Sequence, residues 1–127
     1  MSEVVFVASV ILAWLLREQG SDAILPLIPH AVLSSVNAVE AQSKLVRRGA
    51  QPKAAWESIV SSVRAVIPFD AVQAEIAGSL ILQTQQHGLS LGDRACLALG
   101  LASKSPIYTA DRAWAQLQIG VAIHLVR

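Results

Sequence analysis

The segment Val4-Val5-Phe6-Val7, which leads into an apolar stretch that ends at Leu16, decides the fold class. A short, continuous apolar run is typical of a strand that is buried on both faces of a parallel sheet. The residues from about Ser9 to Gln19 are predicted to form a helix that stops at Gly20, because glycine adopts the left-handed conformation readily. The segment therefore predicts a strand followed by a helix, the unit from which parallel α/β sheets are built.

The same alternation repeats along the chain. Further strands are predicted at residues 31–33, 66–69, 107–109 and 121–126. Helices are predicted before Pro29, at 37–48, after Pro52, from Asp70 to His87, at 90–103 and at 111–117. In the Asp70 helix, Val72, Ile76 and Leu80 are expected to form the apolar stripe. Repeated strand–helix units predict an α/β fold in which helices cover both faces of a central, mainly parallel sheet, with residues 1–127 forming a single domain.

The composition is strongly apolar, with 54% hydrophobic and 15% charged residues. This excess indicates a buried partner interface, which a homodimer, another protein or both would supply. The most apolar run, residues 4–16, is shorter than the roughly 20 residues that cross a bilayer, so no membrane association is expected. Glu3 stands where a secretory signal has basic residues, and the single Cys96 excludes an internal disulfide. A cytoplasmic protein is therefore expected.

Three acids occur at or near the start of predicted helices, although the chain has only 9 acids in 127 residues. Asp93 lies three residues after Ser90, Asp111 follows the strand at 107–109, and Glu40 lies one turn into the helix at 37–48. Each has a purely structural interpretation. Asp93 would complete a capping box, Asp111 would be an N-cap, and Glu40 would be favoured by the helix dipole.

The functional interpretation is that these acids meet at one edge of the sheet. Ligands of open α/β sheets gather beyond the carboxyl ends of the strands, and carboxylates brought together there repel one another unless a cation lies between them. Oxygen ligands without a Cys or His cluster favour Mg²⁺ or Mn²⁺. Such a metal site suits phosphodiester hydrolysis. Thr109 and Ser9 would orient an acid or a bound water, or would serve only in caps and turns.

Other chemistries have weaker support. Cys96 lies on an apolar helix face and is expected to be a core residue, and the 7 glycines are scattered and form no phosphate-binding loop. Asn37 is interpreted first as a helix-start residue and only secondarily as a ligand. Arg47 and Arg48 end a predicted helix, where cations favour the helix dipole, and the net charge of +1 does not by itself indicate a nucleic-acid binder.

Four segments taken in order resemble the PIN-domain family. They are the first strand running into Ala8-Ser9, then Ser34 to Glu40, Leu89 to Ala95 with its Ser-Leu-Gly-Asp-Arg-Ala pattern, and Thr109 to Trp114 with Thr-Ala-Asp-Arg-Ala-Trp. More narrowly, the chain resembles the VapC toxins of bacterial toxin–antitoxin pairs. The resemblance covers essentially the whole chain.

This resemblance implies a three-layer PIN-like sandwich and a Mg²⁺- or Mn²⁺-dependent endoribonuclease that cleaves cellular RNA and arrests growth. It also implies a homodimer and a small VapB-type antitoxin as partner. By position, Glu40, Asp93 and Asp111 match three of the family's four acids and are the expected metal ligands. Thr109 matches the hydroxyl residue before the last acid, and Ser9 matches the serine after the first.

The chain departs from the family at Val7, where the resemblance implies an aspartate. Valine has no oxygen, so we expect metal affinity and turnover to fall by about 10²-fold or more. Two explanations are open: a toxin inactivated deliberately or by selection, which we favour, and a naturally degenerate paralogue kept for binding. The alternative to an impaired enzyme is accordingly a non-catalytic module that sequesters antitoxin or RNA. The fold itself is expected to survive, because valine suits a buried strand.

Overall fold

A computed structural model describes residues 2–126 of the chain, and a five-stranded sheet forms its centre. The strands are β1 (Val4–Phe6), β2 (Ala31–Ser34), β3 (Ala65–Ile67), β4 (Ile107–Thr109) and β5 (Ile123–Leu125). Their order is β3-β2-β1-β4-β5, and every neighbouring pair is parallel. β1 is the central strand and is entirely buried, as its unbroken apolar sequence predicts.

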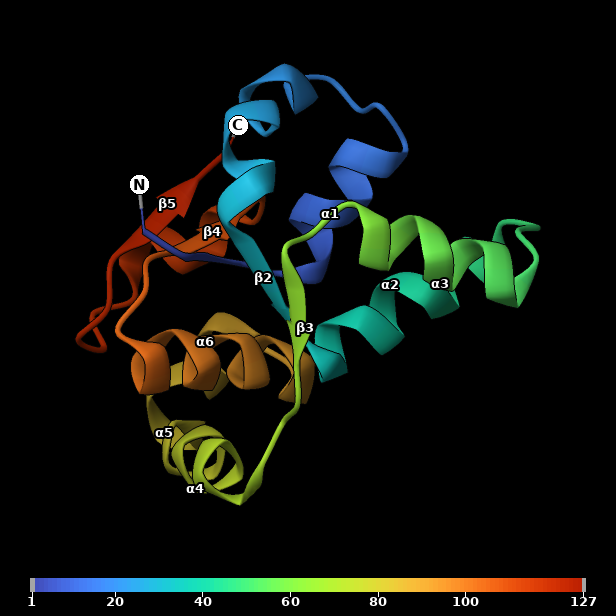
Figure 1. Cartoon of the computed structure of the whole chain (residues 1–127). Coiled ribbons are helices and arrows are strands. Elements are labelled where there is room, and N and C mark those ends of the chain that lie inside the picture. The colour runs from blue at the N-terminus through green and yellow to red at the C-terminus, as the bar shows by residue number, and fades with distance from the viewer. Residues whose placement is uncertain (1, 127) are drawn as a thin grey trace.

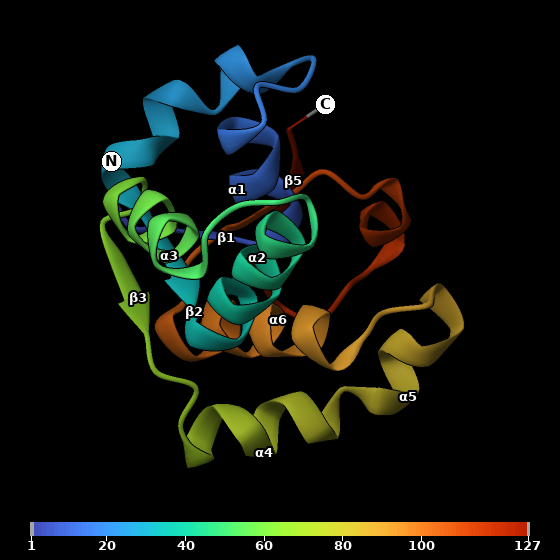
Figure 2. The same cartoon turned by 90° about the vertical axis from the view of Figure 1, so that its right-hand side faces the viewer.

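Helices cover both faces of the sheet, so the predicted three-layer α/β arrangement is confirmed. The α-helices are α1 (Ala8–Leu15), α2 (Ser35–Arg47), α3 (Pro52–Ser61), α4 (Ala71–Ser79), α5 (Ile81–Thr84) and α6 (Leu91–Ser103). Short 3₁₀ turns are η1 (Ser21–Ala23), η2 (Leu25–His30), η3 (Gln85–His87) and η4 (Arg112–Gln116). Figures 1 and 2 show α1 and α3 on one side of the sheet and α6 on the other, with α4 packed outside α6.

The core forms where β1 and β2 meet α1 and α6. The largest fully buried side chains include Trp114, Phe6, Ile11 and Leu33. At Gly100 the last turn of α6 comes so close to β4 that an added Cβ would lie 2.5 Å from Cδ1 of Ile107. The glycine therefore allows α6 to pack tightly against the sheet. Cys96 lies fully buried in this core, as expected from its apolar helix face.

The prediction of one long helix from Asp70 to His87 is wrong. Asp70 does cap the helix, since its Oδ1 accepts from the backbone N–H of Gln73 (2.9 Å), but α4 ends at Ser79. Ser79 Oγ donates back to the carbonyl of Glu75 (2.8 Å), a bond that bends helices, and Leu80 turns into the core. The expected apolar stripe is also wrong at Val72, which is 65% exposed.

Two other helices differ from their predictions. α1 ends at Leu15, before the predicted stop at Gly20, because Arg17 already adopts a left-handed conformation (φ 52°). The segment after Asp111 forms a 3₁₀ turn in place of an α-helix. Pro68 follows β3, which is an edge strand, as its proline suggests. Among residues 2–126, the structure contains no helix with the length and apolar character needed to span a bilayer.

Candidate metal centre

The candidate site lies beyond the carboxyl ends of the three central strands. β1 leads into Val7 and Ser9, β2 leads into α2, and β4 leads into Asp111. Because the strands are parallel and adjacent, their carboxyl ends open on the same edge of the sheet. The N-terminus of α6, which carries Asp93, reaches this edge from the opposite face, where α6 contacts α2.

Glu40 lies on α2 and packs its carboxylate against Gly92 on α6. An added Cβ at Gly92 would overlap Oε1 of Glu40, so only a glycine leaves room for the carboxylate there. Oε1 is buried and has no hydrogen-bond partner within the described part of the chain. Burial raises the pKa of Glu40, the nearby Asp93 raises it further, and Lys44 opposes both effects. Glu40 and Asp93 therefore form a close pair of acids.

Asp93 also performs the structural role that its sequence position indicates. Its Oδ2 accepts from the backbone N–H of Ser90 (2.9 Å), and its own N–H donates to Oγ of Ser90 (3.2 Å). These two bonds form a complete capping box at the start of α6. Since Oδ2 faces the cap, Oδ1 is the oxygen of Asp93 that does not take part in it.

Asp111 lies in a loop held by two hydroxyl groups. Oγ1 of Thr109 accepts from the backbone N–H of Asp111 (3.1 Å), and Oγ of Ser9 accepts from the backbone N–H of Ala110 (3.3 Å). Asp111 itself is exposed, and its Oδ1 accepts from the N–H of Ala113 (2.9 Å) as the cap of η4. Thr109 and Ser9 therefore fix the backbone that carries the acid, while the acid has the predicted capping role.

Asn37 has a larger role than its place at a helix start indicates. Its side chain is fully buried; Oδ1 accepts from the backbone N–H of Ala8 (2.9 Å), and Nδ2 donates to the carbonyl of Gly92 (3.0 Å). One side chain thus joins the start of α1 to the start of α6. Its position three residues before Glu40, on the face of α2 that meets both helices, was the only sign in the sequence.

Residues 4–120 match the PIN domain family. The chain belongs to the PIN-domain family. A search of curated proteins finds no significant match to the sequence. PIN nucleases generally use divalent metals, so the acids at the edge of this PIN sheet are the place to look for such a site.

Solved structures share the PIN fold at low sequence identity. VapBC2 from Rickettsia felis, bound to a promoter DNA fragment, has a TM-score of 0.75 at 13% identity and covers 96% of this chain and 97% of its own. DNA-bound VapBC from Salmonella typhimurium has a TM-score of 0.75 at 12% identity, and the match covers 100% of both chains. VapC20 from Mycobacterium tuberculosis, a sarcin–ricin loop cleaving toxin, has a TM-score of 0.73 at 18% identity. The match covers 94% of this chain and 99% of the VapC20 chain.

Val7 lies between β1 and α1, at the N-cap of α1. It is only 3% exposed, and its backbone N–H donates to the carbonyl of Tyr108 on β4 (3.2 Å). The next residue, Ala8, bonds to Asn37 on the side of Glu40 and Asp93, and Ser9 bonds to the loop of Asp111. Residues 7–9 are therefore joined to β4, to α2 and to the loop of Asp111, and the Val7 side chain contributes no oxygen.

The residues present do not complete a divalent-metal site. Their donor chemistry is suitable, because they offer carboxylate oxygens and the unpartnered Oε1 of Glu40. However, within residues 2–126 no group of three or more His, Cys, Asp or Glu side chains is arranged to hold a metal ion. Glu40 and Asp93 lie close to each other, Asp111 caps η4, and Val7 offers no oxygen ligand.

Proposed function

We propose that this PIN domain is a VapC-type toxin of a type II toxin–antitoxin pair, an endoribonuclease that cleaves cellular RNA and whose Mg²⁺ or Mn²⁺ site is impaired by Val7. The observation that supports this most directly is the position of Val7. It is buried at the point where the segments bearing Glu40, Asp93 and Asp111 are joined. Membership of the family supports the nuclease class, and the likeness to VapC structures supports the toxin assignment.

Each site residue has a separate role in this proposal. With a carboxylate supplied at residue 7, Glu40, Asp93 and Asp111 would hold the metal, and Glu40 would offer Oε1, which has no hydrogen-bond partner among residues 2–126. Thr109 and Ser9 hold the Asp111 loop at its place beside β1. A divalent metal, when bound, lowers the pKa of a water molecule and stabilises negative charge on phosphate oxygens. A fourth carboxylate at residue 7 would supply the oxygen ligand that Val7 does not offer.

The deciding experiment compares this chain with Val7→Asp on defined RNAs in Mg²⁺ or Mn²⁺. Restoring a carboxylate at residue 7 should raise metal-dependent cleavage by about 10²-fold or more, the effect expected of a well-placed catalytic group. Expression of the same variant should arrest growth of the host cell. The measurement is the rate of appearance of cut RNA, with EDTA added in parallel.

Two matched controls test whether the effect of Val7→Asp comes from the charge of its carboxylate and whether it depends on the other acids of the site. Val7→Asn has nearly the shape of Val7→Asp without the charge and should remain as inactive as this chain. Asp93→Asn in the Val7→Asp background should abolish the restored cleavage while leaving most of the cap intact, because an amide oxygen can still accept from the N–H of Ser90. If Val7→Asp neither cuts RNA nor arrests growth, the ribonuclease proposal is wrong.

The second candidate is a non-catalytic PIN module that sequesters antitoxin or RNA. It is favoured by the capping roles of Asp93 and Asp111, which explain both acids without any metal. It is also favoured by the buried, apolar Val7. This candidate predicts that restoring the acid at residue 7 changes neither cleavage nor toxicity.

The proposed partners are a VapB-type antitoxin and a second copy of the chain, with residues 1–127 acting as one PIN unit in the cytoplasm. Support comes from large apolar side chains exposed on α4 and α5, where Val72 is 65% and Leu82 74% exposed. Apolar surface of this kind indicates a protein interface. The mass of the purified chain from light scattering tests the homodimer. Co-purification with the product of a small neighbouring gene tests the antitoxin.

A further inference from the structure

A hollow begins at Ser9 and runs between α1 and α2. We call it the basic groove, and its volume is about 430 Å³. It is lined by Ser9, Leu12, Leu16, Glu18, Lys44, Arg47 and Arg48. Ser9 belongs to both places, since its Oγ accepts from Ala110 beside Asp111. The groove is therefore continuous with the proposed catalytic edge.

The cations of the basic groove follow Glu40 along one face of α2. Lys44 is four residues after Glu40, and Arg47 and Arg48 are seven and eight residues after it. Residues at this spacing share a helix face, and the rise of 1.5 Å per residue puts Lys44 about 6 Å and Arg47 about 11 Å further along the axis. The electrostatic effect of Lys44 on Glu40 agrees with this closeness. A row of positive charge thus leads away from the acids.

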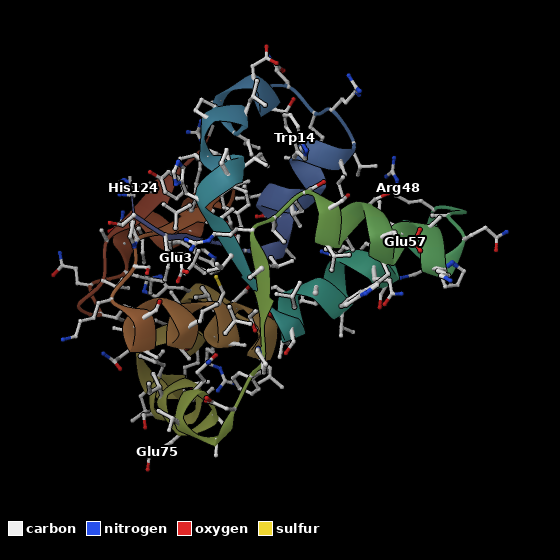
Figure 3. All side chains as sticks on the ribbon, in the orientation of Figure 1. Glu3, Trp14, Arg48, Glu57, Glu75 and His124 are labelled. Atoms are coloured by element: carbon white, nitrogen blue, oxygen red, sulfur yellow. The ribbon has the colours of Figure 1, made fainter. Side chains whose placement is uncertain are left out.

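The row is concentrated and accessible. The lining contains three cations and the single acid Glu18, whereas the whole chain has a net charge of only +1. Lys44, Arg47 and Arg48 are all exposed, and Figure 3 shows the Arg48 side chain projecting into solvent at the end of α2. The helix dipole favours cations at this end of α2. The dipole does not account for their lining a hollow that reaches the candidate site.

We propose that the basic groove binds the phosphate backbone of single-stranded RNA next to the position of cleavage, with Lys44, Arg47 and Arg48 each contacting a phosphate. This inference rests on the proposed ribonuclease function. RNA is favoured as the occupant because phosphates that approach Glu40 and Asp93 are repelled, and cations immediately beyond the acids offset that repulsion. Leu12 and Leu16 give the groove an apolar floor against which a sugar or a base can pack.

The test uses the chain as it stands, because its Val7 allows binding to be measured with EDTA present and without cleavage. Fluorescence anisotropy of a short labelled single-stranded RNA is followed over a range of salt concentrations. Replacing Lys44, Arg47 or Arg48 by Gln should each reduce the slope of log K against log salt by about 0.7. The triple variant should weaken binding about tenfold or more at low salt. Exposed cations elsewhere provide the controls, and Lys53→Gln and Lys104→Gln should leave the slope unchanged.

Two results would overturn the inference. One is a triple variant that folds normally by circular dichroism and binds RNA with the slope of the controls. The other is a triple variant that loses binding to a labelled poly-glutamate peptide but keeps binding to RNA, which would make the groove a protein docking site. The cleavage assay on Val7→Asp separates this inference from the proposed function. If Val7→Asp cleaves RNA but the groove variants leave the salt slope unchanged, only the groove inference is wrong. If Val7→Asp does not cleave RNA but the groove variants reduce the salt slope, only the nuclease proposal is wrong.

Discussion

Among single residues, Glu40 shows how packing changes the pKa of an acid. Its carboxylate lies against Gly92, and one buried oxygen has no hydrogen-bond partner in the described part of the chain; burial together with Asp93 raises its pKa. A raised pKa means that the ionised form is less favourable in the folded chain than in the unfolded chain. The stability that Glu40 contributes is therefore fully present below its unfolded pKa and is lost as the pH rises through its folded pKa.

It follows that Glu40→Gln should raise the melting temperature at neutral pH. The increase should be no more than a few degrees, because the side chain is only half-buried and solvent screens the charge. The difference between the two proteins should shrink towards zero below about pH 3, where glutamate is protonated in both states. Thermal unfolding over a pH series checks this. A difference that is constant with pH would show that the charge is not its cause.

Asn37 presents the opposite case, a neutral side chain whose bonds are all internal. Asn37→Ala leaves the N–H of Ala8 and the carbonyl of Gly92 without partners in a buried place. We expect it to lower the free energy of unfolding by about 2–4 kcal/mol, which denaturant titration measures. The matched control is Gln42→Ala, which removes a side-chain amide that bonds to Pro52 at the surface and should cost less than about 1 kcal/mol. Equal losses in the two variants would contradict the bridging role of Asn37.

At the scale of elements, the N-terminus of α6 has both a structural role, as a capped helix end, and a proposed functional role, as the carrier of Asp93. The capping box of Ser90 and Asp93 satisfies backbone donors at the N-terminus of the helix, and Asp93 is at the same time the neighbour of Glu40. The helix is held against β4 at Gly100, where a side chain would not fit. The place of Asp93 at the sheet edge therefore depends on how the whole helix packs.

Ser90→Ala should separate the contribution of the capping box to stability from the contribution of the Asp93 carboxylate to cleavage. Loss of the Ser90 hydroxyl removes one half of the capping box, and we expect a loss of stability of about 1 kcal/mol. In the Val7→Asp background, metal-dependent cleavage should stay within about threefold, because Asp93 keeps its carboxylate. Chemical denaturation and the cleavage assay measure the two effects. Ser90→Thr, which keeps a capping hydroxyl, should restore most of the stability, and a failure to do so would argue against the cap.

At the scale of the whole molecule, residue 7 lies where three parts of the chain are tied together. Hydrogen bonds from residues 7–9 reach β4, α2 and the Asp111 loop. A carboxylate there would be buried close to other acids, which is unfavourable without a cation. Val7 therefore has a structural benefit in the metal-free molecule, in addition to its expected cost in activity.

Without metal, Val7→Asp should accordingly be less stable than this chain by about 2–4 kcal/mol. Mn²⁺ should recover much of that loss, because a ligand that binds the folded state stabilises it. Thermal unfolding with EDTA and with added Mn²⁺ measures both effects without any cleavage assay. Val7→Asn serves as the control and should respond little to Mn²⁺. An identical response to Mn²⁺ in all three proteins would contradict a metal site at residue 7.

Elements whose signals are local could be predicted from the sequence. The parallel sheet followed from continuous apolar runs such as Val4–Phe6, and the strand at 107–109 has the predicted bounds. The caps at Asp70, Asp93 and Asp111 also followed from short-range patterns. The break after Ser79 was missed because Leu80 turns towards the core, a preference that periodicity along one helix does not reveal.

The amino-acid sequence by itself determined the α/β class, the family and the absence of an oxygen ligand at Val7, because these depend on residue types and on their order. Only the tertiary structure decided that Glu40 pairs with Asp93 and that Asn37 joins α1 to α6. The physical reason is that these contacts join residues tens of positions apart. Their distances are set by how the helices pack across the sheet edge, which no local pattern encodes.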